Sequence, residues 1–394
     1  MRQLDLFPSP HPLTPPHCEE DVLAWLRLLR SRRVGISTFF RLLKEHGTAQ
    51  AALDALPEIA RAAGVEKYRI CPLPVVEQEL KAARYAGAEF IVFGSPSYPA
   101  ALAAIPDPPP LLWAVGDTAL LSRPKVAVVG ARNASSLGLR MARRLAGELG
   151  KKDQVVVSGL ARGIDTAAHQ AALETGTIAV LASGVDVIYP NENTVLGEEI
   201  GREGLRLSEA PMGSSPQARH FPARNRIVSG LSRATIVVEA ATRSGSLITA
   251  RTALDQGRDV FAVPGHPFDA RASGCNLLIR DGATLVRGAG DVIEALEAIP
   301  EAEAAAPATE AAHSAVAPAD ETMRVPTQPE YRKPEEVAVL HDMILNRLGP
   351  SPLAEDQLIR DLARPAAEIT PELVNLEIEG RIQRQPGGLV NRID

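Results

Sequence analysis

Arginine side chains and a small-residue loop gather in one stretch of the chain, from His220 to Ala250. Between Arg202 and Arg251 there are eight arginines against three acidic residues. Within the stretch, the apolar run from Ala234 to Val238 predicts a buried parallel strand, and the loop Ser244-Gly245-Ser246 follows it. Guanidinium groups and the backbone N–H groups of such loops hold phosphate oxygens. The stretch therefore predicts an anion-binding site; the alternative is a solvated charged face.

An aromatic side chain, Phe221, stands among these charges, next to Arg219, His220, Arg224 and Arg226. An aromatic ring among cations can stack on an unpaired base while the cations hold the backbone, and one such stack is worth about 1–3 kcal/mol. The alternative is a core phenylalanine at the start of a helix. A protein that reads a duplex inserts a helix into a groove, whereas small anion-binding sites along one sheet edge suit a single strand. The segment therefore predicts contact with single-stranded DNA.

Two further turns have the composition of anion sites. In the motif VAVVGARNASSLG, Arg132 stands where a dinucleotide-binding fingerprint needs its second glycine, which argues against NAD. Gly130, Arg132 and Ser135 there predict a cup for a lone phosphate at the start of a helix, with a tight turn and a surface arginine as the alternative. In the second motif, SGLARGIDTAAHQ, Ser158 and Gly159 permit close approach of a ligand. We expect structural roles for its other polar residues: Asp165 as a helix cap and His169 as a packed side chain.

Signals for catalysis are weak throughout the sequence. There is no GxSxG nucleophile turn and no GxxxxGK[ST] phosphate loop, and the three cysteines have no metal-ligand spacing. We therefore predict no catalytic residue, no metal and no cofactor. The rival hypothesis is a nucleotide or sugar-phosphate hydrolase of a related Rossmann-like fold, in which a carboxylate such as Glu239 acts on the glycosidic bond.

The elements that position these residues follow from alternating strand and helix patterns between Lys125 and about Gly290. The alternation predicts an α/β fold, an extended Rossmann-like, doubly wound parallel sheet, which binds ligands at the carboxyl ends of its strands. Upstream, the proline-rich segment from Tyr98 to Gly116 is expected to run along the edge of this domain, because Pro108 to Pro110 cannot lie in a central strand.

Composition divides the 394 residues into four segments. Residues 1–72 are expected to form a disordered start followed by a SAM-like or helix-hairpin-helix-like helical domain, whose contact with DNA stays open. Residues 73–298 form the Rossmann-like domain that binds single-stranded DNA. Residues 299–333 are a linker rich in Ala, Pro and Glu, and residues 334–394 form a winged-helix domain.

The predicted third helix of the winged-helix domain is acidic. The segment from Ala366 to Gly380 contains four glutamates and no lysine or arginine, so it would repel a phosphate backbone. We predict that this domain binds protein, a second copy of the chain or a recombinase, and adds little DNA affinity. The counter-evidence is three arginines in the wing, Arg381, Arg384 and Arg392.

The net charge is −6, so any polyanion must bind a local basic patch. No apolar run approaches the roughly 20 residues of a membrane span, and no secretory signal is present. We therefore expect a cytoplasmic protein.

Five motifs in order, GARNASSLG, SGLARGIDTAAHQ, FPARNRIVSGLS, EAATRSGSLITA and DVFAVPG, resemble the DprA/Smf family of DNA-processing proteins. The resemblance is close over residues 90–290, and the helical start and winged-helix end also fit. It implies a protein without known catalysis that binds and protects single-stranded DNA and loads the RecA recombinase onto it during natural transformation. The implied partners are single-stranded DNA, RecA and a second copy of the chain, with single-strand-binding protein as a further candidate.

The resemblance also implies site residues. The anion-binding Gly-x-Arg falls on Gly130 and Arg132, and the small-residue loop falls on Ser244 to Ser246. The aromatic and Arg-Asn-Arg segment falls on Phe221, Arg224, Asn225 and Arg226. Two positions depart from the family: Leu137 replaces a frequent tyrosine, and Gln217, Ala218 and Arg219 stand where a lysine is usual before the phenylalanine. Separately from the resemblance, three apolar residues near the last strand, Phe268, Leu277 and Leu278, are candidates for a dimer patch; the alternative is that they belong to the core.

Overall fold

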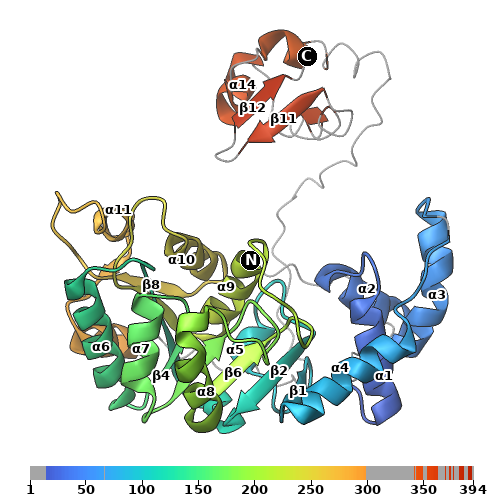
Figure 1. Cartoon of the computed structure of the whole chain (residues 1–394). Coiled ribbons are helices and arrows are strands. Elements are labelled where there is room, and N and C mark those ends of the chain that lie inside the picture. The colour runs from blue at the N-terminus through green and yellow to red at the C-terminus, as the bar shows by residue number, and fades with distance from the viewer. Residues whose placement is uncertain are drawn as a thin grey trace, which may run out of the picture. The chain divides into compact units, whose positions relative to one another are not determined.

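A computed structural model describes residues 15–65, 67–298, 341, 343–348, 353–362, 369, 372–373, 376, 381–385 and 389–392 of the 394. The chain divides into two compact units, Met1–Ala308 and Thr309–Asp394. The first unit holds a small group of helices and a large sheet with helices on both faces (Figure 1).

Three helices form the first core: α1 (Glu19–Arg30), α2 (Ile36–His46) and α3 (Ala49–Ala62). Each helix buries one apolar stripe, and Trp25 of α1 meets Phe39 of α2 edge-on with ring centroids 5.0 Å apart. Val34 and Gly35 lie directly before α2, and Gly35 is its N-cap.

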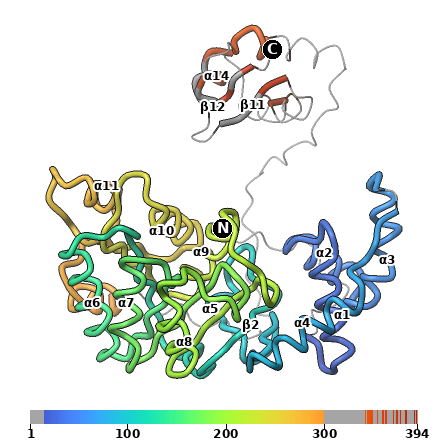
Figure 2. Tube along the Cα trace, in the orientation of Figure 1, coloured from blue at the N-terminus to red at the C-terminus, as the bar shows by residue number. Residues whose placement is uncertain are grey.

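Helix α4 (Leu73–Tyr85) joins this helical group to the sheet. Its buried Glu79 accepts two hydrogen bonds from Arg30 at 2.9 and 2.7 Å, and a third from Trp113 Nε1 at 3.1 Å. Because Arg30 lies on α1 and Trp113 lies on a strand, one carboxylate ties three elements together. The four helices accordingly lie together beside β1 and β2, at one end of the sheet (Figure 2).

The sheet has nine strands in the order β1-β2-β6-β5-β4-β3-β7-β8-β9. Along the run β6-β5-β4-β3-β7-β8-β9, each strand pairs in parallel with the next. Strand β2 is antiparallel to both β1 and β6. The strands are β1 (Glu89–Val92), β2 (Leu111–Gly116), β3 (Lys125–Val129), β4 (Val155–Ser158), β5 (Thr177–Val180), β6 (Leu205–Ser208), β7 (Ala234–Val237), β8 (Asp259–Ala262) and β9 (Thr284–Leu285).

Helices cover both faces of this sheet, so its central strands are buried on both sides. In β3, Val126 and Val128 contact one helix layer, whereas Ala127 and Val129 contact the other. One layer is α5 (Ala100–Ala103), α9 (His220–Leu231), α10 (Ser246–Asp255) and α11 (Ser273–Arg280). The other is α6 (Ser136–Gly150), α7 (Ile164–Ala172), α8 (Thr194–Glu203) and α12 (Ala289–Ala298). The short 3-10 helices are η1 (Thr118–Leu121) and η2 (Asn191–Asn193).

The doubly wound parallel sheet predicted from the sequence is confirmed, but the prediction for the proline-rich segment is wrong in one part. Residues Leu111 to Gly116 do not follow the edge; they form β2, which lies inside the sheet between β1 and β6. The prolines end just before this strand, and its residues Leu111 to Val115 are all buried. Antiparallel pairing at this end lets the sheet extend without a further crossover helix.

The second unit contains a three-stranded antiparallel sheet of β10 (Leu353–Ala354), β12 (Leu389–Arg392) and β11 (Ile382–Gln385), with helix α14 (Glu355–Leu362). Its described core includes Ile344, Leu358, Leu373 and Val390. Most of the predicted acidic helix lies outside the described residues, as does the predicted linker 299–333.

Candidate nucleic-acid interface

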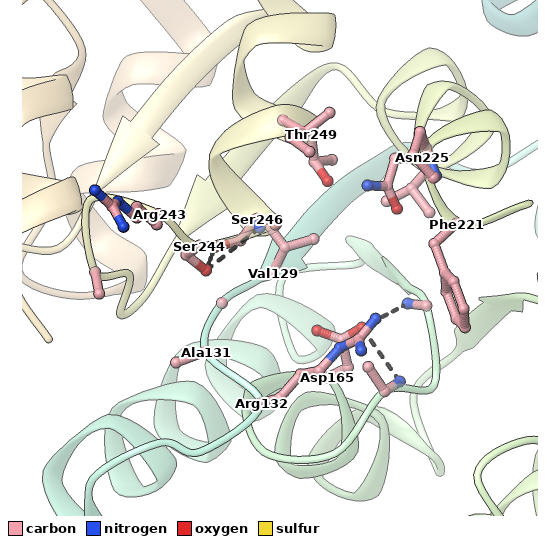
Figure 3. Close-up of a pocket in the computed structure, with 18 of the residues that line it drawn as sticks. Val129, Ala131, Arg132, Asp165, Phe221, Asn225, Arg243, Ser244, Ser246 and Thr249 are labelled. Atoms are coloured by element: carbon pink, nitrogen blue, oxygen red, sulfur yellow. Dashed lines mark hydrogen bonds between the residues drawn. The ribbon is translucent and has the colours of Figure 1, made fainter. Parts of the chain in front are cut away.

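A crevice of about 530 Å³ opens at the carboxyl ends of β3, β4 and β7 (Figure 3). From β3 the chain proceeds outward through β4, β5 and β6, and it then returns to place β7 on the other side of β3. This reversal is the switch point at which doubly wound sheets bind ligands, because the loops after β3 and β7 diverge there.

The loop after β3 provides one exposed cation of the crevice, Arg132. Arg132 is exposed, and its guanidinium carbon lies 5.0 Å from the centre of the Phe221 ring. A guanidinium at this distance from an aromatic face makes a cation–π contact worth about 0.5–1 kcal/mol at an exposed site. The contact brings together a planar cation and a ring from segments 89 positions apart in the sequence.

Helix α9 forms the wall opposite this loop. Phe221 and Asn225 are four residues apart, on one face of the helix, and both line the crevice (Figure 3). Arg224 is also directed to this side, but it is buried, and its Nη1 donates to the carbonyl oxygen of Val180 at 2.7 Å. The guanidinium lies against Gly159, where an added Cβ would be 1.7 Å from Nη1. Only a glycine leaves room for this arginine.

Asp165 attracts the buried Arg224 electrostatically. Its carboxylate accepts hydrogen bonds from the backbone N–H groups of Gly159 at 3.1 Å and Ala161 at 3.3 Å, so it holds the loop after β4. The N-cap of α7 is Gly163, so Asp165 stabilises the loop rather than capping the helix as predicted.

The charges of Arg132, Arg224 and Asp165 bear on which ligand the crevice can bind. Burial lowers the pKa of Arg224 to about 10; Asp165 raises it and the neighbouring positive charge of Arg132 lowers it further. Burial raises the pKa of Asp165, against the opposing effect of Arg224. Arg224 stays a cation at neutral pH, and its Nε has no hydrogen-bond partner among the described residues. Arg132 and Arg224 repel each other and Asp165 attracts Arg224, so an anion between the two guanidinium groups would further offset their repulsion.

The third wall is the loop before α10. Ser244 and Ser246 hydrogen-bond each other through their hydroxyl groups at 2.7 Å, and Gly245 precedes the first turn of α10. An added Cβ at Gly245 meets nothing within 4 Å, so this loop faces open space. Ser246, Ile248 and Thr249 of the first turn of α10 line the crevice, so the positive end of this helix dipole lies beside it.

The predicted phosphate cup at the start of α6 is filled by the protein itself. The Glu239 carboxylate accepts hydrogen bonds from the Ser135 backbone N–H at 2.9 Å and from the Ser135 hydroxyl group. The Ser135 oxygen in turn accepts from Gly138 N at 3.0 Å, which caps α6. Glu239 is 8% exposed and does not line the crevice, so it has the place that a phosphate would take.

The structure brings most of the predicted site residues together. Those that line the crevice are Gly130, Arg132, Gly159, Phe221, Arg224, Asn225, Ser244, Gly245 and Ser246. Those that do not are Ser135, Ser158, Arg219, His220 and Arg226.

Besides Ser135, which binds Glu239, Ser158 and Arg226 have structural partners. Ser158 is fully buried, and its hydroxyl group donates to the carbonyl oxygen of Val128 at 2.6 Å. Arg226 extends from the other side of α9, where it pairs with Glu209 and, at 3.3 Å, with Asp107. The positive charge of Arg226 is thus neutralised within the protein.

Sequence reasoning missed several residues of the crevice as site residues: Asn133, Asp165, Arg243, Thr249 and Arg271. Asn133 and Arg243 follow β3 and β7, and the rule that ligands bind beyond the carboxyl ends of parallel strands would have found them. Arg271 lies far beyond the end of β8, so no local spacing indicates it. Figure 3 shows Arg243 and Phe221 at opposite ends of the crevice.

His169, a possible catalytic residue by type, has the structural role that was predicted. It is fully buried, and its ring nitrogens contact the Thr177 hydroxyl at 2.7 Å and the Leu160 backbone N–H at 3.3 Å. Burial lowers its pKa to about 3, so the ring is neutral at physiological pH. Among the described residues, no group of three or more His, Cys, Asp and Glu side chains could hold a metal ion.

Family models match three successive parts of the chain. Residues 89–297, slightly more than half of the sequence, match DNA recombination-mediator protein A. Residues 19–82 match the DprA-like N-terminal HHH domain, and residues 328–388 match the DprA winged helix domain. The chain belongs to the DprA/Smf family. The predicted fold, a Rossmann-like sheet between a helical and a winged-helix domain, is confirmed with it.

Individual DprA proteins agree with the family models. The DNA processing protein DprA of Streptococcus pneumoniae is 50% identical over 202 residues, which are 51% of this chain and 71% of that protein. The X-ray structure of the S. pneumoniae protein matches with a TM-score of 0.54 at 38% identity, over 69% of this chain and 92% of that one. The DNA processing protein A of Helicobacter pylori, whose structure describes a single-stranded DNA binding mode, matches at 34% identity with a TM-score of 0.49, over 53% of this chain and 96% of that one.

No helix in the described part of this DprA-family chain is long and apolar enough to cross a membrane.

Proposed function

We propose that this protein binds single-stranded DNA in the crevice at the sheet switch point. The observation that carries the proposal is the contact of Arg132 with the Phe221 ring, 5.0 Å away, beside a second, buried guanidinium. A ring and two cations on one crevice match the two parts of a nucleotide, because the base stacks while the phosphate is held by charge. Membership of a family described as DNA recombination mediators supports the same ligand.

The form of the crevice favours a single strand over a duplex. The ring of Phe221 is half-buried in a concave site, so a base must leave its pair and stack to reach it. Three loops and a helix wall line the site, whereas a duplex is read by a helix that enters its major groove. In a duplex, the paired bases would present only their edges to these side chains.

The same geometry disfavours the rival hydrolase. That reaction requires a free carboxylate near the glycosidic bond. Glu239 holds Ser135, and Asp165 holds the loop after β4, so both acids already have structural partners. We propose a mediator without catalytic residues or cofactor, which acts by binding.

Comparison of oligonucleotides with mononucleotides tests the proposal. We expect the full chain to bind oligo-dT more tightly as its length increases, with an affinity that falls steeply as salt rises, because each bound phosphate releases counterions. A duplex of the same length should compete poorly. Release of free base from a nucleoside monophosphate by the purified protein, without length-dependent binding, would instead establish the hydrolase.

We further propose that two copies associate through the apolar patch of Phe268, Leu277 and Leu278. Phe268 is 94% exposed, and the two leucines of α11 are half-buried, Leu278 against the core. Contact with a second copy would remove the apolar surface of Phe268 from water. The variant Phe268→Glu should be monomeric in sedimentation at concentrations where the unchanged protein is dimeric. Equal masses for the two would reject this surface.

A bound single strand would then be protected and passed to RecA in the cytoplasm, as the family resemblance implies, with single-strand-binding protein as a further partner. We propose that the winged-helix domain contributes protein contacts rather than DNA affinity. The fragment of residues 1–298, which lies within one compact unit, should keep most of the single-stranded DNA affinity. Loss of most of that affinity would show that the winged-helix domain binds DNA.

A further inference from the structure

We propose a second nucleotide subsite next to the crevice, built on Tyr189 and Arg162, that receives the base adjacent to the one on Phe221. The inference rests on the proposed function and specifies how a strand continues beyond the crevice. Its ligand class is an unpaired nucleobase with its phosphate, in a strand of at least two nucleotides.

A small cavity of about 30 Å³ marks the subsite. It shares Arg132, Gly159 and Phe221 with the crevice and adds Arg162 and Tyr189, so the two cavities are continuous at the Phe221 ring. A strand that enters one cavity therefore reaches the other across that ring.

Tyr189 provides an aromatic surface that the rest of the fold does not cover. Its side chain is 46% exposed, and its ring centroid lies 6.1 Å from that of Phe221, with the planes tilted by 54°. Rings within about 4.5–7 Å pack directly on each other, which leaves no room for a base between them. Two successive bases would instead stack on the outer faces of the two rings, one on each.

The loop that carries Tyr189 is fixed to the crevice. Asn193, a buried residue of η2, donates through Nδ2 to the Leu160 carbonyl oxygen and to the Thr166 hydroxyl group, both at 2.9 Å. Leu160 directly follows Gly159 of the crevice wall. The segment that carries Tyr189 is thus tied to the loop after β4, and a segment already held in place loses little freedom when a base stacks on its ring.

Arg162 supplies the charge for the second phosphate. Its side chain is 59% exposed, and its Nη1 lies 3.5 Å from Glu192 in an exposed ion pair. Exposed pairs of this kind are worth about 0–1 kcal/mol, so a phosphate can displace the carboxylate. Arg132 and Arg162 both line the small cavity, which gives each aromatic ring a cation of its own.

The test compares Tyr189→Ala and Tyr189→Phe with the unchanged full chain on thymidine monophosphate and on oligo-dT of increasing length. We expect Tyr189→Ala to lose about 5- to 150-fold in affinity for strands of two or more nucleotides, the range that one base–aromatic stack provides. The loss should be smallest for the monophosphate, which Phe221 can hold alone. Tyr189→Phe keeps the ring and should bind normally. The control is Tyr85→Ala, which removes a tyrosine that is 96% exposed on α4.

The outcomes separate the two proposals. Failure of the unchanged protein to bind any length rejects the proposed function itself. Normal binding by Tyr189→Ala rejects the second subsite alone. An equal loss at every length shows that Tyr189 only positions Phe221, which also overturns the inference.

Photocrosslinking locates the subsite directly. With 5-iododeoxyuridine placed at successive positions of one oligonucleotide, the position that crosslinks to Tyr189 should neighbour the one that crosslinks to Phe221. Absence of a Tyr189 crosslink at all positions, with Phe221 crosslinked, would exclude the subsite. In salt titrations, Arg162→Gln should reduce the slope of log K against log salt by about 0.7, the value of one phosphate contact on a single strand.

Discussion

Replacement of Arg132 by alanine tests the central feature of the crevice. The side chain is exposed, lies over the Phe221 ring and is the outer of the two cations. One hydrogen bond between charged partners contributes about 1.5–3 kcal/mol, so Arg132→Ala should weaken binding of single-stranded DNA by roughly 10- to 150-fold at low salt. Because a phosphate contact carries no sequence information, the loss should be similar for all sequences.

The salt dependence gives a sharper measurement than the affinity alone. Fluorescence anisotropy with a labelled oligonucleotide, repeated between about 50 and 200 mM salt, yields the slope of log K against log salt, to which each phosphate contact adds about 0.7 for a single strand. Arg132→Ala should therefore flatten the slope by about 0.7. Arg132→Lys should retain the slope, because it keeps the charge, but lose part of the affinity, because a lysine lacks the planar group that covers the ring.

The matched control is Arg144→Ala. Arg144 is also exposed, lies on α6 and forms an ion pair with Glu148 at 2.9 Å, outside the crevice. The Arg144→Ala substitution removes the same formal charge from the protein. It should change neither the affinity for single-stranded DNA nor the slope of log K against log salt by more than a small factor. If Arg132→Ala keeps the slope of the unchanged protein, Arg132 makes no phosphate contact and the assignment of the crevice is refuted.

Three further predictions follow from individual contacts. Gly159→Ala should displace the Arg224 guanidinium, since the added Cβ would be 1.7 Å from Nη1, and should lower DNA affinity by at least as much as Arg132→Ala; normal binding would contradict the packing described. Glu239→Ala should lower the free energy of unfolding by about 0.5–2 kcal/mol, the range for a lost helix cap, and an unchanged thermal midpoint would show that Ser135 does not need it. Burial lowers the pKa of His169 to about 3, from its ordinary value of 6.5. Between these two pH values, His169 is protonated in the unfolded chain and neutral in the folded chain. Stability should fall as the pH drops from 6.5 toward 3, by about 2 kcal/mol at pH 5 relative to His169→Gln, and parallel pH profiles of the two proteins in denaturant titrations would reject this.

Local sequence patterns predicted the frame of the site because its strands are short, apolar and buried on both faces. The runs at Lys125–Val129 and Ala234–Val237 indicate parallel strands by themselves, and the small residues after them indicate the ligand-binding edge. The pairing of β3 with β7, which opens the crevice, then follows from the topology of doubly wound sheets.

The roles of the two central arginines could not be separated without the orientation of α9. Arg224 and Arg226 are two residues apart, and successive helical residues are about 100° apart around the axis, so their side chains leave the helix on opposite sides. One reaches the crevice, and the other pairs with Glu209 and Asp107. The Arg-Asn-Arg motif predicts one role for both arginines, whereas the helix directs their side chains to opposite sides.

Partners distant in the sequence explain the remaining differences. Glu239 and Ser135 are 104 positions apart, and nothing in the local composition of either segment indicates that the Glu239 carboxylate holds Ser135, the N-cap of α6. The strand β2 was missed because three prolines precede it, although its own residues are apolar. In both cases, tertiary contacts decided what the local sequence left open.

The carboxylate that fills the helix start at Ser135 also bears on competition inside a cell. Free nucleotides are abundant there, and the first helix of a Rossmann-like sheet is where their phosphates ordinarily bind. An intramolecular carboxylate is present at a high effective concentration and never diffuses away. Under the proposed function, metabolites would therefore meet an occupied position at α6, while the crevice lined by Arg132 and Arg224 would bind a polymer at several points at once.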